Sequence, residues 1–304
     1  TPESRYIQVT LLLRQCSIMK TDQSHRKYLQ QYKQPDFTIL RTDLDFSLNA
    51  GVTTVKSRLN IRRQTNDGQA ALVLDGVELK VVDLQIDNDF LDDSDFSYDG
   101  EQLTIPDVPH EFEFVATVEI NPAANTSLEG LYQSNGNYCS QCEAEGFRHI
   151  TFYLDRPDVM SVFTTTVRAD RQAYPVLLSN GNKVGSGEDG KQHWVKWFDP
   201  FPKPSYLFAL VAGDLARVSG TFTTMSGRHV DLQFYTEHHN SEKCGHALSS
   251  LQKAMKWDEE TFGLEYDLDL YMVVAVDDSN MGAMENKGLN VFNTQYVLAN
   301  QQTA

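Results

Sequence analysis

The stretch Asp43-Leu44-Asp45-Phe46-Ser47-Leu48 alternates acidic or hydroxyl side chains with large apolar ones. A period of two is typical of a β-strand that has one face in a core and the other in water. The same alternation returns downstream, at Phe112, Phe114, Val118 and Ile120. Both stretches therefore predict half-buried strands.

Further segments have the composition of short strands, and turn sequences such as Asn66-Asp67-Gly68 and Asn180-Gly181 separate them. They are 52–61, 72–74, 79–82, 149–154, 163–169, 193–198 and 206–212. Many strands without helices between them predict an all-β domain. The segment 199–204 contains three prolines, which lack the N–H that a central ladder needs, so we expect it at a sheet edge or crossing.

The pattern changes near residue 215, where we expect a second domain to begin. Ser241 is expected to cap the start of the first clear helix, and Gly263 to take the left-handed conformation at its end. Strands are expected before and after this helix, over 220–225, 229–235, 268–276 and 289–298. Within the helix, apolar side chains recur at helical spacing, at Leu248, Leu251, Met255 and Phe262.

These patterns divide the chain into three parts. We predict a polar tail over residues 1–35, an N-terminal β domain over 36–214 and a second domain over 215–304. In the tail, Met19-Lys20-Thr21-Asp22 reads like the start of a protein, so residues 1–18 are expected to be upstream sequence. The predicted fold class is mainly β.

The charge balance disfavours one class of partner. The chain has 26 Lys and Arg against 42 Asp and Glu, a formal net charge of −16. Such a surface repels a phosphate backbone, so we expect no nucleic-acid partner. Acidic residues concentrate between Asp83 and Asp99, but the sixth and twelfth positions of a calcium loop counted from Asp93 hold Tyr98 and Thr104. A solvated acidic surface is the better interpretation.

Hydropathy gives no sign of a membrane protein. No apolar run approaches the roughly 20 residues needed to cross a bilayer. The apolar run 9–13 is shorter than the core of a signal peptide and lacks a small-residue cleavage site after it. We therefore expect a cytoplasmic protein without a membrane partner. A monomer is expected as well, although hydropathy does not bear on the oligomeric state.

The run Gly282-Ala283-Met284-Glu285-Asn286 lies between two apolar stretches, 270–276 and 289–297. Its glycine and alanine leave the backbone open to close approach, and a single carboxylate follows two positions later. Flanking strands can hold such a carboxylate rigidly. The pattern is typical of one half of an active site.

Gly-Ala-Met-Glu-Asn is the exopeptidase signature of the aminopeptidase N family of zinc metallopeptidases, and the chain resembles the bacterial branch of that family through most of its length. A second block, Gln141-Cys142-Glu143-Ala144-Glu145-Gly146, also resembles the family, as do 153–158, 199–213 and 255–260. The resemblance implies a saddle-like all-β N-terminal domain and then the first α+β portion of a thermolysin-like catalytic domain.

The resemblance also implies how a peptide is anchored. Glu285 is the principal ligand of the substrate's free amino group, Glu143 joins it from the first domain, and Gln141 lies beside them. An amine about 4 Å from a carboxylate gains on the order of 4 kcal/mol at an effective dielectric of about 20, before desolvation. A blocked N-terminus forfeits that gain. By residue type alone, Glu285 also suits a solvated turn, and Glu143 and Gln141 suit an ordinary surface.

The other signature residues have implied roles as well. Gly282 and Ala283 offer backbone hydrogen bonds to the substrate, and Met281 lines the pocket for its first side chain. Met284 and Asn286 complete the substrate-binding set. By type alone, Met281 and Met284 are equally consistent with packing. Cys139 and Cys142 form a C-x-x-C pair. Redox chemistry or half a zinc site is the alternative to the interpretation that the pair belongs to the block that resembles the family.

Hydrolysis in this family requires a His-Glu-x-x-His helix that binds zinc and activates water. The eight histidines include no such pair; His110-Glu111 begins like one, but Phe114 stands at the second histidine. The resemblance places the zinc helix beyond the signature, so we expect zinc in the full-length protein and none bound by this chain.

The resulting functional prediction is the N-terminal part of a bacterial, zinc-dependent aminopeptidase that acts on peptides with a free N-terminus. This chain by itself is expected to lack peptidase turnover. Two alternatives stay open: the epoxide-hydrolysing branch of the same superfamily, and a non-catalytic binding or scaffold protein.

Overall fold

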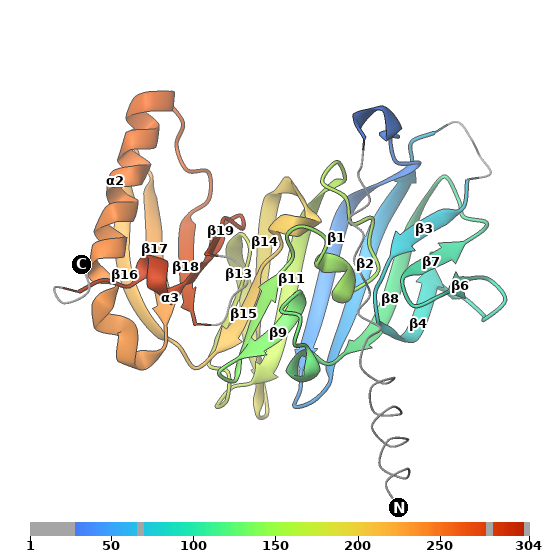
Figure 1. Ribbon diagram of the computed structural model, residues 1–304, viewed down its shortest axis with the longest axis horizontal. Helices are drawn as coiled ribbons and strands as arrows, with labels where there is room; N and C mark the ends of the chain where they lie inside the picture. The colour runs from blue at the N-terminus through green and yellow to red at the C-terminus, as the bar shows by residue number, and fades with distance from the viewer. Residues whose placement is uncertain (1–27, 66–69, 278–281, 301–304) are drawn as a thin grey trace, which may run out of the picture. The chain divides into compact units, whose positions relative to one another are not determined.

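The computed structural model describes residues 28–65, 70–277 and 282–300 (Figure 1). The chain divides into two compact units, 1–34 and 35–304. The described part of the first unit contains one turn of 3-10 helix, η1 (Leu29–Gln31). The boundary that we predict near residue 215 lies inside the second unit and stays a prediction.

The second unit is built around an eight-stranded sheet with the order β13-β14-β11-β1-β2-β8-β4-β5. Its neighbouring strands are antiparallel except β1 and β11, which are parallel. The strands lie side by side in Figure 1, with the bounds β1 Phe37–Leu48, β2 Thr53–Arg63, β4 Lys80–Ile86, β5 Asp89–Phe90, β8 Glu111–Ile120, β11 Met160–Asp170, β13 Asn182–Asp189 and β14 Gln192–Pro204.

The alternation in the first strand sets its two faces. Leu44, Phe46 and Leu48 are buried, whereas Asp43 and Asp45 lie on the opposite, partly exposed face. The predicted half-buried strands β1 and β8 are therefore confirmed. The mainly β fold class is confirmed with them.

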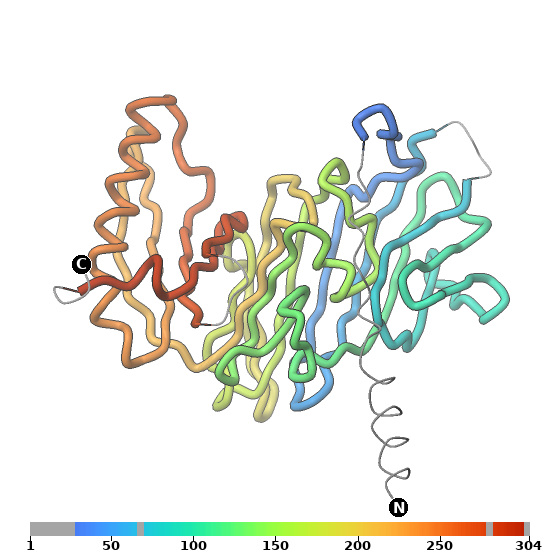
Figure 2. The backbone as a smooth tube through the Cα atoms, in the orientation of Figure 1, coloured from blue at the N-terminus to red at the C-terminus, as the bar shows by residue number. Residues whose placement is uncertain are grey.

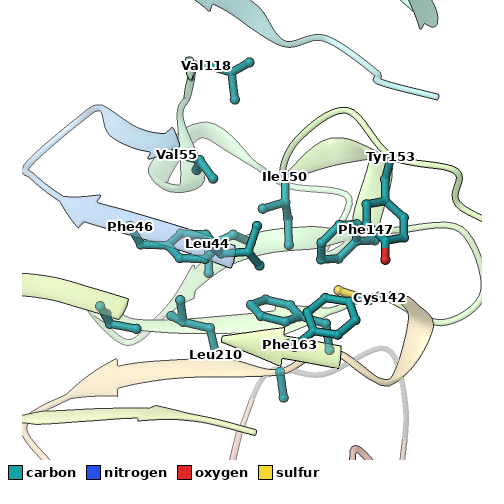
Figure 3. Close-up of a cluster of buried hydrophobic side chains, with 14 of the residues drawn as sticks. Leu44, Phe46, Val55, Val118, Cys142, Phe147, Ile150, Tyr153, Phe163 and Leu210 are labelled. Carbon is teal, nitrogen blue, oxygen red and sulfur yellow. The ribbon is translucent and has the colours of Figure 1, made fainter. Parts of the chain in front are cut away.

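A second sheet, β12-β15-β10-β9, contributes to the core beside the large sheet. Its strands are β9 Gly130–Ser134, β10 Asn137–Gln141, β12 Val176–Ser179 and β15 Leu210–Gly213. Figure 3 shows Phe46 and Phe163 of the large sheet in one cluster with Leu210 of β15 and Phe147. The Phe208 ring lies 5.9 Å from that of Phe46 and 5.3 Å from that of Phe147, centroid to centroid.

Smaller elements complete this region. The three-stranded sheet β3-β7-β6 consists of β3 Leu72–Asp75, β6 Ser97–Tyr98 and β7 Gln102–Ile105. Short 3-10 helices are η2 Pro122–Ala124, η3 Phe147–His149 and η4 Ser205–Leu207. Most of the aspartates between 83 and 99 are exposed, as a solvated acidic surface requires.

The C-terminal part forms a five-stranded sheet with the order β16-β17-β18-β20-β19. Its elements are β16 Ala216–Thr223, β17 His229–Thr236, η5 His238–Lys243, α2 Gly245–Phe262, β18 Leu270–Val276, β19 Ala283–Met284, β20 Leu289–Asn293 and α3 Thr294–Val297. Helix α2 packs on one face of this sheet, where Met255 lies in a cluster with Val230 and Leu232. Figure 2 follows the chain from α2 through β18 to the hairpin β19–β20.

Four local predictions need correction. The strand predicted over 206–212 begins only at Leu210, because the 3-10 helix η4 occupies residues 205–207. The segment 149–154 is not a strand: it continues from η3 through a buried turn, and only Tyr153 forms an isolated bridge, to Asp75. Ser241 does not cap α2, because it lies inside η5 and Cys244 precedes the helix. The strand predicted over 289–298 ends at Asn293, whose side chain accepts the Gln295 N–H and starts α3.

The end of α2 and the proline segment behave largely as predicted. Gly263 takes the left-handed conformation with φ of 66°, and its N–H donates to the Glu259 carbonyl. The prolines of 199–204 belong to β14, which is an inner strand by order. Beyond Phe198, however, β14 pairs only with β11, so the prolines face a local edge where no N–H is needed.

None of the helices in the described ranges combines the length and the apolar character needed to span a bilayer.

Candidate functional site

The signature residues form the outermost strand of the C-terminal sheet. β19 pairs only with β20, in antiparallel register with Ala283 opposite Phe292 and Met284 opposite Val291. The Asn293 N–H donates to the Gly282 carbonyl at 2.9 Å, which makes Ala283 and Phe292 a non-hydrogen-bonded pair. The N–H and C=O of Ala283 therefore point away from β20, toward the open edge.

This register separates the roles predicted for Gly282 and Ala283. The Gly282 carbonyl already accepts a hydrogen bond inside the sheet, whereas the Ala283 backbone faces outward. Gly282 is instead constrained by space: an added Cβ would lie 3.0 Å from the Tyr296 ring. Ala283 is thus the residue of the pair whose backbone N–H and C=O face the open edge of the sheet.

The next three residues alternate in exposure. Met284 is buried at 1% exposure, Glu285 is exposed, and Asn286 is buried at 2%. Among the described residues, the Asn286 Nδ2 atom has no hydrogen-bond partner. Packing, one of the two interpretations of Met284, accounts for its position. Met281 lies outside the described residues.

The segment after the signature is held from both sides. The Lys287 ammonium lies 2.6 Å from Asp267 and 4.7 Å from the centre of the Phe201 ring. Gly288 has φ of 74°, and an added Cβ would lie 2.9 Å from Leu268 and 3.2 Å from the Gly181 nitrogen. These contacts fix the backbone immediately behind Glu285.

Asn180 ties this segment to the second sheet. Its side-chain amide donates to the carbonyls of Leu207, at 2.9 Å, and Lys287, at 2.8 Å, and its oxygen accepts the Ala209 N–H at 2.8 Å. Asn180 is only 3% exposed, so these bonds are shielded from water. Sequence reasoning missed this residue, because Asn180-Gly181 reads as a turn.

Gln141 and Asn180 lie at the same end of the four-stranded sheet, where strands β10 and β12 finish. β10 and β12 flank β15 and are both antiparallel to it, so they run in the same direction. Gln141 ends β10 and Asn180 follows the end of β12, two strand spacings or about 10 Å away. Two residues span at most about 7 Å of chain, so the backbone of Glu285 lies close to the Lys287 carbonyl that Asn180 holds.

Glu143 lies in the turn that follows Gln141. Gln141 is 4% exposed and its amide donates to the Glu143 carbonyl at 3.4 Å, whereas the Glu143 side chain is half-buried. The peptide bond from Glu143 to Ala144 is cis. Gly146 passes so close to the Gln141 carbonyl that an added Cβ would lie 2.4 Å from it.

A buried ion pair anchors the far end of this turn. The Arg148 Nε donates to Asp155 at 3.0 Å, and the Ser205 hydroxyl donates to the other carboxylate oxygen at 2.6 Å. Burial raises the pKa of Asp155, and these two donors oppose that rise. The charged side chains thus position the turn that carries Glu143.

The cysteine pair is poorly placed for redox chemistry. Cys139 and Cys142 are both free and fully buried. Burial raises the pKa of the Cys142 thiol well above its ordinary value, and the Asp155 carboxylate adds to that rise. Because the thiolate is the reactive form, Cys142 is better suited to packing.

Within the described ranges, no three His, Cys, Asp or Glu side chains are grouped so as to hold a metal ion. His238 pairs instead with Asp214 at 2.9 Å on the surface. The zinc ion that the resemblance implies has no ligand set among these residues, so no chemical step is assigned to it.

Two family descriptions match the chain: the Peptidase M1 N-terminal domain over residues 30–207, and the Peptidase family M1 domain over residues 246–304. Aminopeptidase N of Escherichia coli (strain K12) is 53% identical over 93% of this chain and 32% of the relative. Aminopeptidase N of Caulobacter vibrioides is 50% identical over 94% of this chain and 33% of the relative.

A solved structure is also similar, that of Legionella pneumophila aminopeptidase A in complex with aspartic acid. Its TM-score is 0.88 at 37% identity, over 91% of this chain and 33% of that one. The chain spans about a third of the length of the curated relatives it matches.

Proposed function

This chain belongs to peptidase family M1, and from that premise we propose that it is the N-terminal part of a zinc-dependent aminopeptidase that removes N-terminal residues from peptides. The observation that carries the proposal is the juxtaposition at β19 of an outward-facing Ala283 backbone and the exposed Glu285 carboxylate. Matches to proteins named aminopeptidase N favour this function over the epoxide-hydrolysing and scaffold alternatives.

In the proposed complex, an extended peptide lies along the open edge of β19. Its backbone exchanges hydrogen bonds with Ala283, as a strand added to a sheet edge does. Its protonated amine pairs with Glu285, which fixes the position of the chain end. A charge-assisted hydrogen bond of this kind is worth about 1.5–3 kcal/mol.

Glu143 and Gln141 are proposed as the second part of the amine site. Two observations support an approach of Glu143 and Gln141 to the signature. Gln141 and Asn180 lie at the same end of the second sheet, and Asn180 donates a hydrogen bond to the Lys287 carbonyl. Two carboxylates around one ammonium reject a peptide without a free amine, because a neutral N-terminus leaves both charges unpaired. Met281 remains proposed for the pocket of the first side chain.

The chain's own groups bind and orient the substrate in this proposal, and zinc in the full-length protein supplies a polarised water when bound. The 304-residue sequence contains no His-Glu-x-x-His motif. We therefore propose that the chain alone does not hydrolyse peptides. A cytoplasmic location and a monomeric state also stay predictions.

Turnover measurements test the proposed function. The full-length protein should release the first residue of a short peptide, but not of its N-acetylated form, and a zinc chelator should stop the release. The 304-residue chain should release none. Equal hydrolysis of the acetylated peptide, or zinc-dependent release by the chain alone, contradicts the proposal.

A further inference from the structure

The short helix η4 is hydrogen-bonded to other segments at both of its ends. At its first residue, the Ser205 hydroxyl donates to the Asp155 carboxylate at 2.6 Å. At its last residue, the Leu207 carbonyl accepts a hydrogen bond of 2.9 Å from the Asn180 amide. Ser205 is 1% exposed, and Asp155 and Asn180 are 4% and 3% exposed. Both bonds are therefore shielded from water, which makes them stronger than bonds at the surface.

The bond at Ser205 leads to the turn that carries Glu143. Asp155 accepts hydrogen bonds from the Arg148 backbone N–H at 3.2 Å and from the Arg148 Nε atom at 3.0 Å. The Arg148 guanidinium also lies 3.7 Å from the carboxylate of Glu145, two residues beyond Glu143. Ser205 is thus connected, through two side chains, to the turn in which Glu143 lies.

The bond at Leu207 leads to the signature segment. The Asn180 amide that donates to Leu207 also donates to the Lys287 carbonyl, at 2.8 Å. The Lys287 ammonium is held in addition by Asp267, at 2.6 Å. Because two residues span at most about 7 Å of chain, these contacts fix the backbone close to Glu285.

Helix η4 joins the two connections. Its single turn is closed by the Phe208 N–H, which donates to the Ser205 carbonyl at 3.0 Å. Ser205 and Leu207 are two residues apart, or about 4 Å along the axis of a 3-10 helix. The two connections are therefore short and anchored to one turn, which restricts how far the backbones that carry Glu143 and Glu285 can move relative to each other.

We propose that Ser205 is a positioning residue of the amine site, where it controls the distance between Glu143 and Glu285. It acts through Asp155 and Arg148 and does not touch the peptide. The inference rests on the proposed function, because it requires both carboxylates to bind one ammonium group. The ammonium gains from both carboxylates only if each lies within hydrogen-bond distance, about 2.7–3.2 Å, so a small displacement of one weakens the preference for a free N-terminus.

Calorimetric titration of the chain with tetra-alanine, in its free and N-acetylated forms, tests this role. Ser205→Ala should lower the ratio of the two affinities about fivefold, which corresponds to the loss of one ordinary hydrogen bond. Ser161→Ala is the matched control, because it removes another fully buried hydroxyl, which bonds with that of Thr42 at 2.8 Å in the large sheet. The control should lower the melting temperature by a similar amount and leave the affinity ratio unchanged.

A double-variant cycle tests whether Ser205 acts through Glu143. In a Glu143→Gln background, Ser205→Ala should have no further effect on the affinity ratio, because the carboxylate that it positions is gone. Arg148→Lys keeps the positive charge but loses the planar guanidinium, so it should lower the ratio in the wild-type background as Ser205→Ala does. This variant carries the test if Ser205→Ala does not fold.

The outcomes separate this role from the proposed function. A wild-type chain that binds both peptides equally contradicts the proposed function and this role with it. A wild-type preference that Ser205→Ala and Arg148→Lys both leave unchanged overturns the positioning role alone. A loss of the same size in Ser161→Ala, or an undiminished effect of Ser205→Ala in the Glu143→Gln background, overturns it as well.

Discussion

Substitution of Asn180 should uncouple the signature segment from the second sheet. Asn180→Ala removes three hydrogen bonds of 2.8–2.9 Å from a side chain that is 3% exposed. At about 1 kcal/mol net for each bond, the free energy of unfolding should fall by about 3 kcal/mol. At about 2–4 °C per kcal/mol for a chain of this size class, the melting temperature should fall by roughly 6–12 °C.

Two further variants make this prediction specific. Asn182→Ala, two residues away, removes two longer bonds to Asp269 from a half-buried side chain and should cost about 1 kcal/mol or less. Asn180→Asp should be at least as damaging as Asn180→Ala, because a carboxylate oxygen would face the Leu207 and Lys287 carbonyls. Thermal and urea unfolding measure all three. Equal losses for Asn180→Ala and Asn182→Ala would refute the coupling role.

Two predictions concern neighbouring parts of the second unit. Burial lowers the pKa of Lys203 from 10.5 to about 8, although Asp199 lies only 3.2 Å away. Between about pH 8 and 10.5 the unfolded chain therefore binds more protons than the folded chain. The free energy of unfolding of the wild type should rise with pH in this range, relative to that of an Asp199→Asn/Lys203→Met double variant. Urea unfolding at several pH values measures both, and parallel pH profiles of the two proteins would contradict the prediction. Gly288→Ala should destabilise the folded chain by about 2 kcal/mol, because the position has a positive φ and an added Cβ would contact Leu268 and Gly181. Gly190→Ala, at a position with a positive φ and open space, should cost about 1 kcal/mol. Equal melting temperatures of the two variants would refute the contribution of the contacts.

Local pattern was sufficient for the strands β1 and β8 and insufficient for the turns. β1 and β8 were predictable because their alternation reports directly which face is buried. The segment 149–154 is just as apolar, but Ile150 and Tyr153 are buried from within a turn that the Arg148–Asp155 ion pair holds. Burial, rather than extended structure, explains its composition.

The candidate site was likewise predictable from the sequence only in part. The signature was found from its residue types, and its strand neighbours from their apolar runs. The outward direction of the Ala283 backbone depends on the β19–β20 register, and the position of Gln141 at the same end of the second sheet as Asn180 depends on how β10 and β12 flank β15. Both are relations between strands, which no local pattern contains. Asn180 was missed for this reason: its partners are 27 and 107 residues away.

Recognition of a free amine by Glu285 is the central claim, and calorimetry of one peptide in its free and N-acetylated forms tests it most directly. The wild-type chain should prefer the free peptide by about 30-fold, which corresponds to about 2 kcal/mol for the charged hydrogen bond. Glu285→Gln should remove most of the preference and leave only the part that Glu143 supplies, and Glu260→Gln, a matched change at an exposed position of α2, should preserve it. A Glu285→Gln variant that still prefers the free peptide by 30-fold would contradict the claim.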